Sequence, residues 1–519
     1  MQKLPIGIQS FEKIRTGDYL YIDKTKQIYD LVNSAGYFFL SRPRRFGKSL
    51  LISTLKELFL GNKELFKGLF IEDKIEWKKY SVVHLDFAKS NYKKLGLELA
   101  IKERLQHQAS LYEIELIKET ISSQLEELIR KLKGKYNQQV VLLIDEYDKP
   151  IIDFLGEETI HIAEENRDIM KDFYSPIKSL DDELEFFFLT GVSRFSKVSI
   201  FSDLNHLNDI SIDDNFSTLV GYTQKELELH FEEYINKLSK KYKLEKEETL
   251  SNLKSWYNGY SWTGEERLYN PFSVMSALQK SNFDNYWFTT GTPTFLVKLM
   301  REERYYDMDN TIMDLQTLSS FDITNMQPVT VLFQTGYLTL IEEKRMNVYK
   351  LGYPNREVKN SMLNMLLNSY THNKEGFAIP LAIQIEEAFV AQDFEALFVY
   401  FDSLFAKIPY QIFEQYKESY YHSVIFLTLE LLGFYIDSEV STSRGRIDAV
   451  VKTEDAIFIL EFKVNGTAED AIKQIKEKGY ADKYKSEQKK KNQKGKQIYL
   501  IGVAFKDKSI DKYLIEELE

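Results

Sequence analysis

The sequence predicts an α/β protein with a parallel sheet in its N-terminal part and a smaller α/β unit near its C-terminal end. Three observations predict this. Short apolar runs alternate with amphipathic helical stretches, each run is apolar at nearly every position, and a strand–strand–helix–strand pattern closes the chain. Strands buried on both faces of a parallel sheet have this continuous apolar character. With 519 residues, the chain has room for about three domains.

Apolar runs mark the expected strands of the N-terminal sheet, and helical patterns separate them. The strands are expected at 37–41, 82–87, 140–145 and 185–190, with helices at 49–60 and 97–133 among the stretches between them. Strands that alternate with helices in this order are typical of an α/β domain.

The central part of the chain is more helical and more charged. We expect helices at 224–243 and 246–257, an aromatic turn-rich stretch at 256–262, and a short strand pair at 331–340 and 346–351. The chain is therefore divided into an N-terminal domain (1–223), a helical lid or accessory and connecting region (224–395) and a C-terminal domain (396–519).

The C-terminal domain has the order of a complete small α/β unit. Helices are expected at 394–405 and 410–432, a hairpin at 446–451 and 456–463, a Lys-rich helix after it, and a last strand at 497–504. Between Ser441 and Ile510 there are 16 Lys and Arg against 10 Asp and Glu, whereas the whole chain carries a net charge of −11. This shift in charge supports a domain boundary before the basic segment.

Composition excludes several classes of protein. The chain has no Cys, which rules out disulfides, thiol nucleophiles and zinc-thiolate sites and fits a cytoplasmic protein. It shows no secretory signal and no apolar run long enough for a bilayer, so we expect no membrane partner. The motifs H-E-x-x-H, G-x-S-x-G and G-x-G-x-x-G are absent. A net negative charge argues against a protein that coats nucleic acid over its whole surface.

A phosphate-binding pattern follows the first expected strand. Gly47, Lys48 and Ser49 form the second half of a phosphate-binding loop at the start of a helix, with Arg42 where the usual motif has its first glycine. In such a loop the lysine reaches the β- and γ-phosphates and the hydroxyl ligates Mg²⁺. The alternative is an exposed strand-to-helix turn.

Acidic and polar residues follow two later strands. Asp145 and Glu146 end the run 140–145, where P-loop NTPases hold Mg²⁺ with an Asp and polarise the attacking water with a Glu. Thr190 ends the run 185–190 and Arg194 follows it, and both could sense the γ-phosphate. The alternatives are a helix cap for the two carboxylates and ordinary turn residues for Thr190 and Arg194.

The C-terminal hairpin brings two more carboxylates together. With its turn centred between Glu454 and Asp455, antiparallel pairing sets Asp448 directly opposite Glu461, and Lys463 shares their face of the sheet. Opposed like charges destabilise a sheet unless a cation neutralises them, so we expect a divalent metal, Mg²⁺ or Mn²⁺, at Asp448 and Glu461. The alternative is a solvated hairpin face with mixed charges.

Neighbouring residues could add to this site. Glu418 is a further carboxylate, although a helix-surface residue is the simpler interpretation. Gln474 could contact a metal-bound water or pack within its helix. Ten Lys against three acidic residues between Lys473 and Lys496 could hold phosphates, but such a run is more often a solvated surface.

These motifs resemble those of two known families. The N-terminal part is similar to the AAA-ATPase-like family of bacterial proteins, through Leu4–Phe11, Tyr21–Thr25, Arg42–Ser49, Leu143–Asp148, Thr190–Phe195, Tyr257–Tyr260 and Tyr269–Ser273. Its members are P-loop ATPases that carry this Arg-Pro-Arg-Arg-Phe-Gly-Lys loop, so the resemblance implies ATP as the ligand.

The C-terminal part resembles the PD-(D/E)xK nuclease superfamily, through Gly445–Asp448, Ile459–Lys463 and the helix with Gln474. That resemblance implies a restriction-endonuclease-like fold. It makes Asp448 and Glu461 metal ligands, and Lys463 the catalytic group that positions water or stabilises charge.

The leading hypothesis is an ATPase whose nucleotide state controls a metal-dependent nuclease-like domain acting on DNA or RNA. The alternative is a nucleotide-switched binding or signalling protein whose C-terminal fold holds nucleic acid or protein without cutting. ATP and Mg²⁺ are the expected cofactors in either case, and oligomerisation is left open.

Overall fold

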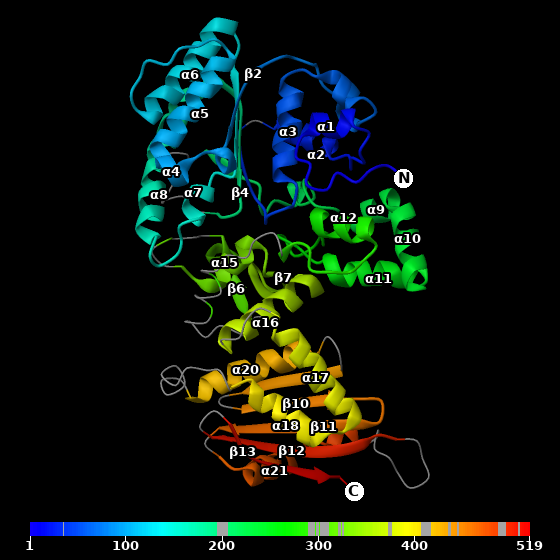
Figure 1. The fold of residues 1–519 in the computed structure, drawn as a ribbon. Helices are drawn as coiled ribbons and strands as arrows, with labels where there is room; N and C mark the ends of the chain where they lie inside the picture. The colour runs from blue at the N-terminus through cyan, green and yellow to red at the C-terminus, as the bar shows by residue number, and fades with distance from the viewer. Residues whose placement is uncertain are drawn as a thin grey trace. The chain divides into compact units, whose positions relative to one another are not determined.

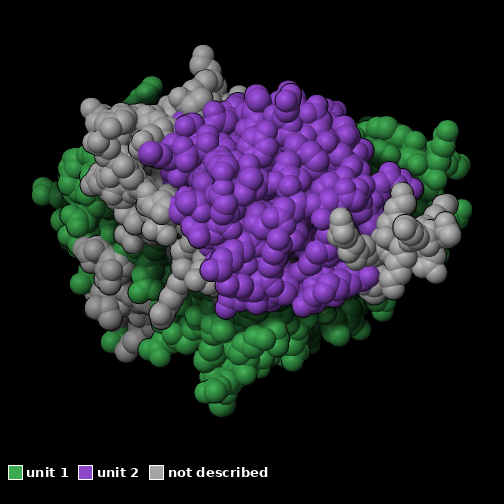
Figure 2. Space-filling view, turned by 90° about the horizontal axis from the view of Figure 1, so that it is seen from below, with its two compact units in different colours: residues 1–295, 307–358 green, residues 296–306, 359–519 purple. Residues whose placement is uncertain are grey.

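A computed structural model of the chain describes residues 1–34, 36–194, 206–288, 296, 300, 311–319, 323, 326–371, 376–405, 417–433, 437–443, 446–464, 466–485, 495–506 and 509–518. The chain forms two compact units, coloured separately in Figure 2. Unit 1 comprises residues 1–295 and 307–358, and unit 2 comprises residues 296–306 and 359–519. In the described part of the chain, no helix is long and apolar enough to cross a membrane. The predicted domain boundaries at 223 and 395 stay predictions.

Unit 1 is built on a parallel five-stranded sheet. Its strands are β1 (Tyr37–Ser41), β2 (Ser81–Asp86), β3 (Val140–Asp145), β4 (Leu184–Gly191) and β5 (Leu207–Asp209), in the spatial order β2-β3-β4-β1-β5. The four predicted strands are confirmed, and β1 and β3 are buried at every position. Because all strands run in one direction, the carboxyl ends of β1, β3 and β4 meet at one edge of the sheet.

Helices cover both faces of this sheet (Figure 1). One face carries α1 (Phe11–Thr16), α2 (Thr25–Asn33) and α3 (Lys48–Phe59), and the other carries α4 (Tyr92–Leu95), α5 (Leu97–Leu111), α6 (Ile121–Tyr136), α7 (Lys149–Ile152) and α8 (Ile160–Tyr174). The single helical stretch predicted at 97–133 is two helices. It breaks because Glu113 takes a left-handed conformation with φ +52° and the Thr120 side chain caps the N-terminus of α6.

A cluster of short helices packs against the N-terminal segment. These helices are α9 (Gln224–His230), α10 (Glu232–Tyr242), α11 (Lys246–Tyr257) and α12 (Pro271–Lys280). The predicted helix 224–243 is interrupted at Phe231, whose side chain joins the buried core of the cluster. Leu4 and Ile22 belong to the same core, so the start of the chain and the accessory region fold as one body.

Unit 1 also contains a small three-stranded sheet. Its strands are β6 (Ile312–Asp314), β7 (Thr339–Arg345) and β8 (Val348–Gly352), in the order β6-β8-β7, with helices α14 (Leu315–Leu318) and α15 (Pro328–Thr335) between β6 and β7. The predicted strand over 331–340 is wrong for residues 331–335, which form a helix. Pro328 starts that helix and Gly336 ends it with φ +89°.

Unit 2 contains helices and a mixed five-stranded sheet. The helices are α16 (Arg356–Tyr370, of which residues 356–358 belong to unit 1), α17 (Ala378–Ala391), α18 (Phe394–Ser403), α20 (Lys417–Leu432) and α21 (Ala468–Glu477). The strands are β9 (Asp437–Ser443), β10 (Arg446–Lys452), β11 (Ala456–Val464), β12 (Gln497–Lys506) and β13 (Ser509–Glu517), in the order β13-β12-β11-β10-β9. The predicted hairpin and last strand are confirmed, whereas β9 and β13 at the two sheet edges were not predicted.

Alternate residues of β11 face two different helical layers. Ile457 and Ile459 pack against α21 through Ile472 and Ile475. Phe458 packs on Phe389 of α17. The odd-numbered face of β11, which carries Glu461 and Lys463, is therefore the face covered by α21.

The close approach of two turns in unit 1 gives a stability test. Gly259 has φ +110°, and a Cβ there would lie 1.9 Å from the carbonyl oxygen of Pro354. We expect Gly259→Ala to lower the free energy of unfolding by at least about 2 kcal/mol, measured by urea denaturation. Gly68 is the matched control, because it has φ +79° and a Cβ there would meet nothing within 4 Å. Gly68→Ala carries only the left-handed strain, about 1 kcal/mol, so equal losses in the two variants would contradict the steric account.

Candidate functional site

The loop between β1 and α3 has the geometry of a phosphate-binding loop. Gly47 has φ +100° and precedes the first residue of α3, so the free N–H groups of the helix start face the loop. The side chain of Lys48 is buried, and its Nζ donates to the carbonyl oxygens of Arg42 at 2.9 Å and Pro43 at 3.1 Å. The loop thus curls around the lysine ammonium, which fits the predicted role of Gly47, Lys48 and Ser49.

Arg42 anchors the start of this loop. Its side chain is 1% exposed. Its Nη1 donates to the carbonyl oxygens of Ser41 (2.9 Å) and Ser211 (2.7 Å), and its guanidinium lies 4.2 Å from the ring centroid of Trp262. Burial lowers the pKa of Arg42 to about 9.

The backbone explains why an arginine is tolerated where the usual motif has glycine. The N–H of Arg42 donates to the carbonyl of Gly191 on β4, so the strand pairing simply continues by one residue. The left-handed conformations fall instead at Arg45, with φ +67°, and at Gly47.

Residues from the later part of unit 1 contact the phosphate loop and stabilise it. The indole Nε1 of Trp287 donates to the carbonyl of Arg44 at 3.0 Å, and its backbone N–H donates to Glu357 at 2.6 Å. Glu357 is fully buried, and burial raises its pKa to about 7. A Cβ at Gly336 would lie 2.5 Å from the ring of Pro43. The segment 311–358, to which sequence reasoning assigned no role, therefore packs on the phosphate loop.

Asp145 ends β3 beside this loop and is almost fully buried. Burial and the neighbouring Glu146 raise its pKa to about 7, whereas a hydrogen bond from Ser49 and the charge of Lys48 act in the opposite direction. Its Oδ1 has no hydrogen-bond partner among the described residues. A buried carboxylate oxygen beside a serine hydroxyl suits Mg²⁺, which takes oxygen ligands, so the residues present fit this ion.

The turn after β3 is tied to the end of β4. Glu146 takes a left-handed conformation with φ +53°. Asp148 is fully buried and accepts hydrogen bonds from the N–H groups of Val192 (2.9 Å) and Ser193 through Oδ2. A Cβ at Gly191 would lie 2.6 Å from Asp148 Oδ1, so this junction requires glycine. Burial and the charge of Glu146 raise the pKa of Asp148 to about 6.

The two residues predicted at the end of β4 lie apart from the cavity of the site. Thr190 is fully buried. Arg194 forms an ion pair with Asp209 through Nη2 at 2.5 Å, and its Nη1 donates to Ser319 at 2.9 Å. Neither side chain is among those that line the cavity described next.

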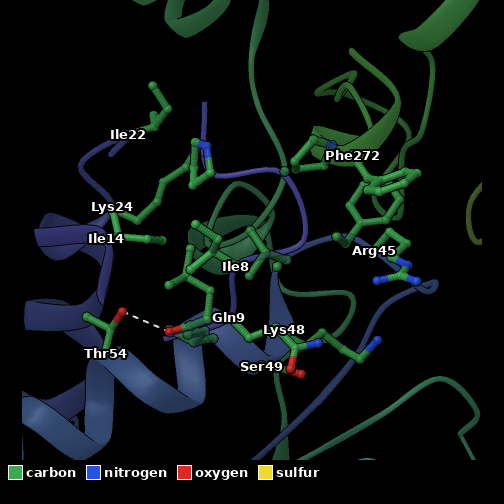
Figure 3. A pocket seen from close by; sticks show the side chains of 18 of the residues that line it. Ile8, Gln9, Ile14, Ile22, Lys24, Arg45, Lys48, Ser49, Thr54 and Phe272 are labelled. Carbon is green, nitrogen blue, oxygen red and sulfur yellow. Dashed lines mark hydrogen bonds between the residues drawn. The ribbon is translucent and has the colours of Figure 1, made fainter. Parts of the chain in front are cut away.

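A cavity of about 310 Å³ opens at the phosphate loop (Figure 3). The loop residues 44–49, Glu146 and Lys149 line one part of it. Apolar side chains line much of the rest, together with the polar side chains of Gln9, Lys24 and Thr54. Apolar lining residues from the N-terminal segment, from 219–222 and from α12 include Ile8, Leu20, Ile22, Val220, Phe272 and Met275. Its volume lies in the range of small-molecule sites, about 300–1,000 Å³.

Sequence reasoning missed this apolar part of the cavity. The stretches Leu4–Phe11 and Tyr269–Ser273 stood out only as parts of a resemblance, without a role. An ion pair also joins the start of α2 to α9, because Lys24 Nζ lies 2.6 Å from Glu226 Oε1 and both side chains are largely shielded from solvent. Burial lowers the pKa of Lys24, and Glu226 opposes this shift.

The second candidate site lies on the β10–β11 hairpin. The predicted register is confirmed, because Asp448 pairs with Glu461. Glu461 is fully buried, and Lys463 Nζ donates to Glu461 Oε1 and to Gln474 Oε1, each at 2.6 Å. Gln474 therefore reaches the site from α21.

Several predicted residues of this site lie outside the described residues. These are the side chains of Asp448 and Glu418 and part of the Lys-rich stretch, at 486–494. Among the described side chains, no three metal-ligating groups gather here. The residue types fit these ions, because an Asp paired in register with a Glu carries the carboxylate oxygens that Mg²⁺ and Mn²⁺ prefer.

The fold and these sites define a protein with a P-loop ATPase-like N-terminal domain and a nuclease-like C-terminal domain. Comparison with known proteins agrees. Residues 5–201 match the AAA-ATPase-like family, described as predicted AAA-ATPase, and residues 416–513 match the PD-(D/E)XK nuclease superfamily. A protein of Azotobacter chroococcum mcd 1, named only as an uncharacterized protein in the vnfD 5′ region, is 38% identical over 533 residues, spanning 100% of this chain and 99% of that protein. The chain belongs to the same family as that protein, with an AAA-ATPase-like domain followed by a PD-(D/E)XK nuclease superfamily domain, and both resemblances are confirmed.

The anchor at Arg42 gives a test of the loop. Arg42→Gly restores the glycine of the usual motif, yet we expect ATP to bind at least about tenfold more weakly, a loss of about 1.4 kcal/mol. The carbonyls of Ser41 and Ser211 lose their donor, and the loop loses its hold on Trp262. Calorimetric titration measures the affinity for ATP, at a temperature where circular dichroism shows that the variant is folded. Arg42→Lys keeps the charge without the planar guanidinium that lies over Trp262, and its affinity for ATP should fall between those of the parent and Arg42→Gly. Unchanged affinity in Arg42→Gly would contradict the anchor.

Proposed function

We propose that this protein is a cytoplasmic, Mg²⁺-dependent ATPase whose nucleotide state controls a metal-dependent nuclease in its C-terminal domain, acting on DNA or RNA. The ATPase part of this proposal is supported by the cavity that Lys48, Ser49 and Glu146 line, beside buried Asp145. The nuclease part is supported by the hairpin, which pairs Asp448 with Glu461 next to Lys463.

Each residue of the nucleotide site has a distinct role. Lys48 moves from the loop carbonyls to the β- and γ-phosphates, and the N–H groups at the start of α3 bind the same phosphates. Ser49 and Asp145 hold Mg²⁺, which neutralises phosphate charge when bound. Glu146 orients the attacking water at the cavity wall.

Each residue of the proposed nuclease site also has a distinct role. Asp448 and Glu461 hold Mg²⁺ or Mn²⁺, which polarises the scissile phosphate when bound. Lys463 orients the attacking water or stabilises the charge that develops on the phosphate. Gln474 Oε1 accepts a hydrogen bond from Lys463 Nζ at 2.6 Å and so holds the ammonium group in one position.

One observation favours the alternative of a nucleotide-switched binding protein. The Lys463 ammonium already donates to both Glu461 and Gln474, so its charge is engaged within the protein. In that case the C-terminal fold would hold nucleic acid or protein without cutting it.

The nucleotide site is tested by two substitutions. Lys48→Ala should abolish ATP binding, because the ammonium that meets the phosphates is gone. Glu146→Gln should keep ATP binding and lower turnover by about 100-fold or more. Calorimetry measures binding, and release of inorganic phosphate measures turnover. Lys56→Ala, on the same helix but away from the cavity, is the control and should behave like the parent. Tight ATP binding by Lys48→Ala would refute the assignment.

The nuclease site is tested on the purified protein with Mg²⁺ or Mn²⁺ and a mixed set of single- and double-stranded DNA and RNA, with and without ATP. Asp448→Ala and Glu461→Gln should each reduce cutting by at least about 100-fold, since a metal ligand is lost. ATP turnover should change little, because the ATPase residues lie in unit 1. Glu454→Gln, at the exposed hairpin turn, should cut like the parent. If the parent cuts nothing with either metal, the binding alternative replaces the nuclease.

A further inference from the structure

Hydrolysis of ATP builds negative charge around the γ-phosphoryl group, and P-loop enzymes commonly meet this charge with a second cation besides the loop lysine. Arg194 was the residue predicted near that position. In the structure its guanidinium is committed to Asp209 and Ser319, and its backbone N–H donates to Gln334 at 2.8 Å. It does not line the cavity, so the position of the second cation is open to another residue.

Lys149 lines the same cavity as Lys48, Ser49 and Glu146. It begins α7, three residues after Glu146, and its backbone N–H donates to the carbonyl of Glu146 at 3.1 Å. The turn that places Glu146 at the cavity wall therefore also places Lys149 there. Its side chain is 30% exposed, which leaves it room to change rotamer.

A partly buried carboxylate, that of Asp153, binds the Lys149 ammonium. Lys149 Nζ lies 3.2 and 3.3 Å from the two oxygens of Asp153, whose side chain is 11% exposed. Asp153 also accepts a shorter hydrogen bond from Tyr92 Oη at 2.8 Å and forms an ion pair with Lys93 at 2.7 Å.

Asp153 keeps two close partners if Lys149 leaves. Burial by itself would raise the pKa of Asp153, but the hydrogen bonds from Lys93 and Tyr92 and the charge of Lys149 outweigh it and lower that pKa. Tyr92 and Lys93 remain with the carboxylate, so the departure of Lys149 does not leave its charge unpaired.

We propose that Lys149 is a catalytic residue that supplies the second positive charge to the γ-phosphoryl oxygens during ATP hydrolysis, in the role first predicted for Arg194. This inference rests on the proposed ATPase function. In the reaction the oxygen of water, oriented by Glu146, forms a bond to the γ-phosphorus. The bond from that phosphorus to the β,γ-bridging oxygen breaks, and ADP keeps the electron pair. The water proton passes to Glu146 or to the phosphate product, while Lys149 keeps its proton and contributes only charge.

The test separates turnover from binding. Lys149→Met removes the charge at nearly constant length, and we expect kcat for ATP hydrolysis to fall by about 100-fold or more while the Kd for ATP changes by less than about threefold. Lys149→Arg should restore most of the turnover. Lys93→Met is the matched control, since Lys93 pairs with the same Asp153 but is 62% exposed and does not line the cavity. It should leave kcat within about threefold of the parent.

Three results would overturn the proposal. Parental turnover in Lys149→Met would exclude Lys149 and leave the ATPase assignment intact. A large loss of kcat in Arg194→Met, with none in Lys149→Met, would return the role to Arg194. A parent that binds ATP without hydrolysing it would refute the ATPase assignment and this inference together. Thermal unfolding checks each variant, and Lys149→Gln replaces Lys149→Met if the latter is destabilised.

Discussion

The shape of the phosphate loop depends on the contacts of the buried Arg42 guanidinium. Removing such a charge from water costs several kcal/mol, and the protein recovers this through two carbonyl acceptors and the face of an indole. Those partners come from β1, from the segment after β5, and from the turn at 260–262. Three stretches distant in sequence must therefore meet before the phosphate loop has its shape, so the loop is a product of the whole of unit 1.

The segment 311–358 completes this dependence. It places Gly336 against Pro43 and Glu357 on Trp287, and it engages Arg194 through Ser319 and Gln334. The phosphate loop and the end of β4 thus share one set of supports, although they belong to different strands. The segment that contacts the phosphate loop through Gly336 therefore also holds Arg194 through Ser319 and Gln334. The nucleotide site is accordingly wider than the motif that marks it.

Sequence alone predicted those parts of the protein whose signals are local. The buried strands of unit 1 are continuous apolar runs, and the register of Asp448 with Glu461 follows from counting back from a turn. Some misses come from weak or ambiguous local signals, and others come from contacts between distant segments. The three residues of β5 are too few to show a pattern, and the helix at 331–335 has the apolar composition of a strand. The pairing of Arg194 with Asp209, and the apolar wall around Ile8 and Phe272, arise only when separate segments pack together.

The aromatic contacts of the phosphate loop have one further consequence. Two of the four tryptophans touch that loop, since Trp262 faces Arg42 and Phe46 and Trp287 hydrogen-bonds to Arg44. The light that an indole emits depends on the polarity and hydrogen bonding of its surroundings. Both rings sit where those surroundings would alter as the loop closes on a ligand. The protein thus carries a native optical reporter of its loop, readable without any attached dye.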